Sequence, residues 1–73
     1  MTTVTFQIAT RADWLAVCTS VFIAEGRLNP SDAAKAALAC WDNCVKDAGT
    51  AEGVLRDFPP ADVAKTEMSY WTP

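Results

Sequence analysis

Cys18, Cys40 and Cys44 are the side chains in this sequence with the widest capacity for chemistry. Thiolates bind soft metals and attack electrophiles, and Cys40 and Cys44 would share one face of a helix. A structural zinc site usually needs four ligands and often includes His, yet the chain has no His. We therefore expect the cysteines to pack as small hydrophobic residues, with no metal and no cofactor. A redox or intermolecular disulfide role and, less favoured, a thiolate metal site stay open as alternatives.

Catalytic groups are scarce elsewhere in the sequence. The commonest general base, His, is missing, and no Gly-rich phosphate loop or zinc-protease motif occurs. Asp57 and Asp62 flank Pro59-Pro60 and are most simply solvated loop charges. We expect no catalytic residue and no enzymatic activity.

The charge pattern argues against nucleic-acid binding. Nine acidic and six basic residues give a net charge of −3, with no basic cluster. The acidic residues are too scattered to mimic DNA. A helix-turn-helix reading would place residues 31–36 in the major groove, but Lys35 is the only basic side chain there.

The longest apolar run, residues 15–24, is too short to cross a bilayer, and the first residues lack the pattern of a secretion signal. The odd number of cysteines fits reduced thiols. These features predict a cytoplasmic protein that does not bind membranes.

Residues 29–49 carry the strongest structural signal. Asn29 is a favoured N-cap, Pro30 suits the first helical position, and Gly49 can end the helix in a left-handed conformation. Apolar residues recur at helical spacing between these ends, which predicts a buried stripe containing Leu38 and Trp41. The full stripe is Ala34, Leu38, Trp41, Val45 and Ala48.

A second helix is predicted from Arg11 to Glu25, with Thr10 as its N-cap and Gly26 as its stop. Its main apolar stripe consists of Trp14, Cys18, Val21 and Phe22. The connector to the next helix is short, so the two helices should form an antiparallel hairpin.

The remaining segments are shorter. Thr50 could cap a helical turn that Pro59-Pro60 ends, and a last helix is expected from Ala61 to about Met68. Alternating residues 3–9 predict a β-strand, paired either with residues 69–72 or with a second copy of the chain. The predicted fold is mainly α: a single small helical domain over residues 1–73, with a two-helix hairpin, a shorter C-terminal helix and a short N-terminal β-strand.

Phe6, Tyr70 and Trp71 are candidate partner-binding residues, because they lie near the termini where little chain can cover them. We expect a non-enzymatic protein-binding module whose protein partner the sequence does not identify. In size and charge, though through no motif, the chain resembles the small anti-CRISPR inhibitors, which implies a phage or mobile-element inhibitor of a host protein complex. The alternative is a self-assembling or accessory subunit that forms a homodimer through its N-terminal strand and aromatic C-terminus.

Overall fold

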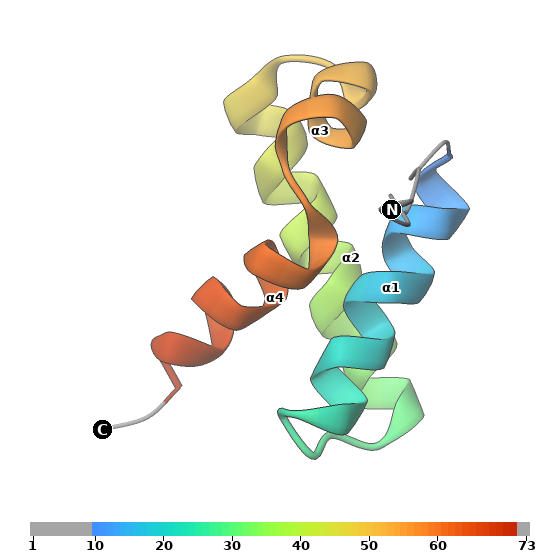
Figure 1. Ribbon diagram of the computed structural model, residues 1–73, viewed down its shortest axis with the longest axis vertical. Coiled ribbons are helices and arrows are strands. Elements are labelled where there is room, and N and C mark those ends of the chain that lie inside the picture. The colour runs from blue at the N-terminus through green and yellow to red at the C-terminus, as the bar shows by residue number, and fades with distance from the viewer. Residues whose placement is uncertain (1–9, 72–73) are drawn as a thin grey trace, which may run out of the picture.

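The computed structural model describes residues 10–71, and this part of the chain forms four α-helices (Figure 1). They are α1 (Arg11–Ala24), α2 (Pro30–Ala48), α3 (Ala51–Asp57) and α4 (Pro60–Ser69). The predicted mainly helical fold is confirmed, and the expected helical turn after Thr50 is a separate short helix. The predicted strand at residues 3–9 lies outside the described residues.

Three of the four helices begin with a side-chain cap that was predicted from the sequence. Thr10, Asn29 and Thr50 each adopt an extended backbone conformation, and each side-chain oxygen accepts a hydrogen bond from the backbone N–H three residues later. These bonds satisfy amides that have no partner within the helix. Pro30 and Pro60 occupy the first helical positions of α2 and α4, where the missing N–H costs no hydrogen bond.

The C-terminal ends of the helices agree less well with the predictions made from the sequence. Gly49 ends α2 with a φ of 84°, the left-handed conformation predicted for it. Gly26 was expected to end α1 in the same way, but Arg27 has the positive φ, 58°. Gly26 instead lies where α1 approaches α4, and its missing side chain makes room for that contact.

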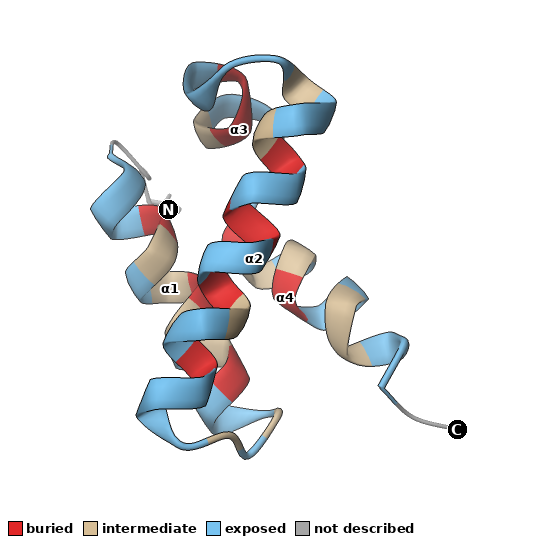
Figure 2. Ribbon diagram, turned by 180° about the vertical axis from the view of Figure 1, so that it is seen from behind, coloured by how far each residue is buried: buried red, intermediate tan, exposed pale blue. Residues whose placement is uncertain are grey.

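The first two helices run antiparallel as the predicted hairpin, α3 lies at the C-terminal end of α2, and α4 packs mainly against α1 (Figure 1). Within residues 10–71, the buried core contains only apolar residues and lies between these helices (Figure 2). Its members are Trp14, Cys18, Phe22, Ala33, Ala37, Cys40, Trp41, Cys44, Val54 and Ala64.

The buried face of α2 differs from the predicted stripe. Trp41 is buried as expected, but Leu38 is 41% exposed and that prediction is wrong. Apart from Trp41, α2 buries only small residues, Ala33, Ala37, Cys40 and Cys44, which recur along one side of the helix. Small side chains allow two helix backbones to approach closely, so this contact does not use the largest aliphatic side chain of α2.

None of the described helices is both long and apolar enough to cross a membrane.

Candidate functional site

The described residues offer little for acid–base chemistry. No polar or charged residue is buried among them. Asp57 and Asp62 are both exposed, and Asp57 forms an exposed ion pair with Arg56 at 3.2 Å. The Asp57 carboxylate raises the pKa of the Arg56 guanidinium. Asp57 and Asp62 therefore lie at the surface as exposed charges, as predicted for this pair.

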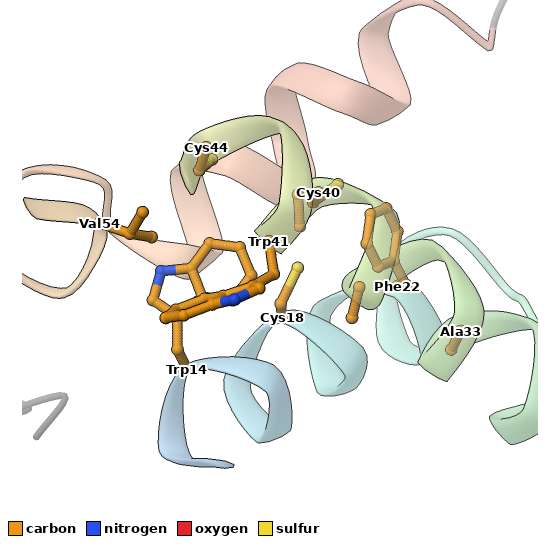
Figure 3. Close-up of a cluster of buried hydrophobic side chains, with 10 residues drawn as sticks. Trp14, Cys18, Phe22, Ala33, Cys40, Trp41, Cys44 and Val54 are labelled. Carbon is orange, nitrogen blue, oxygen red and sulfur yellow. The ribbon is translucent and has the colours of Figure 1, made fainter. Parts of the chain in front are cut away.

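The three cysteines lie together in the core as free thiols (Figure 3). The thiol contact with Cys40, together with burial, raises the pKa of Cys18, and burial raises that of Cys44. The predicted packing role is confirmed for all of them by their burial. Within residues 10–71, no group of three or more Cys, Asp or Glu side chains has the arrangement of a metal site.

Trp14 and Trp41 form the aromatic centre of the core. Their rings meet edge to face with centroids 5.3 Å apart. The Trp14 indole N–H donates a 2.8 Å hydrogen bond to the carbonyl of Phe58, and the Arg11 guanidinium lies 5.9 Å from the centre of the Trp41 ring. The expectation that these two tryptophans fill the core is confirmed, so they are not available to a partner.

The C-terminal aromatic pair lies at the end of α4, where the last turn is closed by hydrogen bonds between residues three apart. Tyr70 is 77% exposed. Trp71 is 43% exposed, and its ring stacks on Phe22 of α1 with centroids 5.3 Å apart. Its indole N–H donates to Glu67 Oε2 at 3.3 Å.

The two aromatic residues therefore differ in availability. Tyr70 presents most of its side chain to solvent, whereas Trp71 uses one ring face on the core and leaves part of its surface free. The third predicted partner-binding residue, Phe6, lies outside the described residues. We define the C-terminal aromatic surface as Tyr70 and the exposed part of Trp71.

Gly26 was predicted from the sequence to end the first helix, and in the structure it has a different role. A Cβ atom there would lie 2.7 Å from the Phe22 carbonyl oxygen, 3.0 Å from Met68 Sδ and 3.3 Å from the Trp71 ring. Gly26 thus lies where there is no room for a side chain between the Phe22 carbonyl of α1 and the Met68 and Trp71 side chains. A glycine beside a helix end gives no sequence signal that separates this role from helix termination.

Leu38 and Ile23 are further large hydrophobic residues with substantial exposure, at 41% and 40%. Single apolar side chains at this exposure are common on protein surfaces and do not by themselves mark a site. The aromatic surface differs from them because Trp and Tyr combine a large apolar area with a polar group.

Comparisons with known proteins add no assignment: no family model matches the chain, no curated protein matches it, and no solved structure resembles it significantly.

Proposed function

We propose that this chain is a non-enzymatic protein-binding module that engages its partner through the C-terminal aromatic surface. The observation that carries the proposal is the 77% exposure of Tyr70 beside the partly exposed Trp71. Tyr and Trp are enriched among the residues that dominate binding energy at protein interfaces. Their rings supply large contact areas at a small cost in conformational entropy.

The positioning of the surface also supports a binding role. Trp71 is held by its stack on Phe22 and its bond to Glu67, so one of the two aromatic residues is already ordered before binding. A preorganised contact loses less conformational entropy when the complex forms. Inhibition of a host protein complex, as the size and charge suggest, is one form this binding would take.

Affinity capture from the native host tests the proposal. We expect the wild-type chain to retain a specific protein, and Tyr70→Ala to lose most of it, because the substitution removes an exposed ring without disturbing the core. The control is Leu38→Ala, which removes a partly exposed apolar side chain from a different helix. Equal capture by wild type and Tyr70→Ala, or loss of capture with Leu38→Ala, would contradict the proposed site.

A homodimer remains the alternative use of the same surface, because an isologous contact would bury Tyr70 and Trp71 against their own copies. Light scattering of the purified chain separates the two functions. A stable dimer that Tyr70→Ala converts to a monomer would favour self-assembly over binding of a different protein. A monomeric wild-type chain would leave the aromatic surface free for that protein.

A further inference from the structure

We propose that the C-terminal aromatic surface binds an arginine side chain of its protein partner, with the guanidinium stacked on the open face of Trp71 and attracted by the Glu67 carboxylate. The inference rests on the proposed function, because it names the chemistry of the partner at the same surface. Three features of the molecule support it: the covered parts of the indole, the carboxylate beside the ring, and the positions of the neighbouring basic residues.

The open face of Trp71 is identified by the contacts that the rest of the ring makes. One face stacks on Phe22, with centroids 5.3 Å apart and the rings 17° from parallel. The indole N–H edge meets Glu67 Oε2, and Cζ3 on the benzene edge lies 3.3 Å from the point where Gly26 would carry a Cβ. Trp71 is nevertheless 43% exposed, so the part of the ring that meets solvent is the face opposite Phe22.

Glu67 places a negative charge beside this face, and no cation balances it. The one ion pair within residues 10–71 joins Arg56 to Asp57, so no Lys or Arg side chain in this range lies at salt-bridge distance from the Glu67 carboxylate. Its Oε2 accepts the Trp71 indole N–H, and its side chain makes no other hydrogen bond in the described part of the chain. The carboxylate therefore has acceptor capacity left for a charged donor.

The neighbouring basic residues leave the open face uncovered. Lys65 is two residues before Glu67 and so projects from α4 about 200° away around the helix axis. Arg27 lies exposed in the connector after α1. The only cation–π contact among the described residues is made at Trp41, so neither basic side chain covers the Trp71 ring. The net charge of −3 also favours approach of a cationic segment.

Arginine fits this combination better than other side chains. A cation is attracted to the face of an aromatic ring, and tryptophan gives the strongest attraction. The guanidinium is planar, so it can stack on the indole while its N–H groups donate to a carboxylate, whereas the lysine ammonium is a compact and strongly hydrated charge. A proline or aliphatic side chain would cover the ring but would leave the Glu67 carboxylate without a cationic partner.

Two-dimensional NMR of the isotope-labelled full chain tests the contact through the indole N–H signals, one from each of the three tryptophans. The probe is an acetylated, amidated pentapeptide with two arginines, and its matched control carries citrulline, which has nearly the same shape without the charge. We expect the arginine peptide to shift the Trp71 signal saturably and the citrulline peptide to bind at least about three-fold more weakly. The Trp14 and Trp41 signals should stay in place, which shows that the core is undisturbed.

Variants separate the local carboxylate from the net charge. Glu67→Gln keeps an acceptor for the indole N–H but removes the charge, so it should weaken binding of the arginine peptide about two- to five-fold. Glu52→Gln is the matched control, because it changes the net charge equally but lies on α3 at the C-terminal end of α2. It should bind as the wild type does. Trp71→Phe keeps a ring for the stack and should also weaken binding, as followed by the Tyr70 amide signal.

Equal binding of the two peptides, equal effects of Glu67→Gln and Glu52→Gln, or an unchanged Trp71 signal would overturn the arginine contact. A Trp71 shift caused by anionic lipid vesicles but not by the peptide, or by dimerisation of the chain alone, would overturn it as well.

Affinity capture tests the protein-binding function separately. A partner that Tyr70→Ala loses but Glu67→Gln retains in full would overturn the arginine contact and leave that function standing. Saturable binding of the arginine peptide with no protein captured by the wild-type chain would support the contact and count against the function.

Discussion

Two tryptophans lie at opposite ends of α1, and their surroundings differ sharply: Trp14 belongs to its N-terminal part, and Trp71 contacts Phe22 near its C-terminal end. Trp14 is fully buried, meets Trp41 edge to face, and donates its indole N–H to a backbone carbonyl at 2.8 Å. Trp71 is 43% exposed, stacks on Phe22, and donates to a side-chain carboxylate at 3.3 Å. We call these regions the Trp14 end and the Trp71 end of the core.

The difference shows that the number of elements packed around a tryptophan ring determines how much of the ring is exposed. At the Trp14 end, α1, α2 and the segment after α3 all enclose the ring, so its position is fixed. At the Trp71 end, one short helix carries the ring onto α1, and part of the ring surface stays exposed. The first arrangement favours stability, and the second leaves room for binding.

The largest expected effect lies at the Trp14 end. Trp14→Ala should lower the free energy of unfolding by about 3–5 kcal/mol, because it leaves a large cavity and removes the donor to the Phe58 carbonyl. For a domain of this size that loss approaches the whole stability. Urea denaturation followed by circular dichroism measures it, and a change below about 1 kcal/mol would mean that the two ends are not different in kind.

Gly26→Ala tests the fit at the Trp71 end. The new Cβ would meet the Phe22 carbonyl oxygen and Met68, so the substitution should cost about 1–3 kcal/mol. Gly49→Asn is the control, since Gly49 has open space around it and the substitution meets only the left-handed backbone penalty, which is at most about 1–2 kcal/mol. A neutral Gly26→Ala would contradict the close contacts of Gly26 with the Phe22 carbonyl oxygen and Met68.

Trp71→Ala should cost about 1–2 kcal/mol, from the lost ring stack and the half-buried area. Tyr70→Ala, one residue earlier and mostly exposed, should change stability by less than about 0.5 kcal/mol. Equal effects of the two substitutions in thermal melts would remove the distinction between a ring that covers the core and a ring that faces solvent.

The smallest effect concerns Arg27, which carries a positive φ in the connector beside the Trp71 end. Arg27→Gly should raise the free energy of unfolding by about 0.5–1 kcal/mol, because glycine adopts this conformation without the Cβ penalty. Arg27→Ala is the control for loss of the side chain and should give no such gain. A decrease with Arg27→Gly would show that the strain is not significant.

The local features of this fold were predictable, because they depend on residues only a few positions apart. The caps at Thr10, Asn29 and Thr50 and the stop at Gly49 all follow from such short-range signals. The buried face of α2 was not, because the stripe through Leu38 is as periodic as the small-residue face that packs. Which face of α2 is buried depends on how closely α1 and α2 approach each other. The residue pattern of one helix does not determine that distance.

The candidate site, like the fold, was predictable only in part. An aromatic pair near a chain end predicts exposure, and Tyr70 has it. The stacking of Trp71 on Phe22 joins residues 49 positions apart, and the part played by Gly26 depends on that contact. Sequence spacing cannot reveal such long-range contacts, so the different behaviour of adjacent Tyr70 and Trp71 emerges only from the structure.

The hydrogen bond from Trp14 to the Phe58 carbonyl also bears on the order in which the molecule folds. This bond links residues 44 positions apart, from α1 to the segment that follows α3. The contacts within the α1–α2 hairpin join residues that are closer in sequence. The α1–α2 hairpin can begin to form from local signals, but the Trp14 indole has its acceptor only after the segment beyond α3 arrives. Docking of this segment is therefore expected to be the late, cooperative step that converts a loose hairpin into the native core.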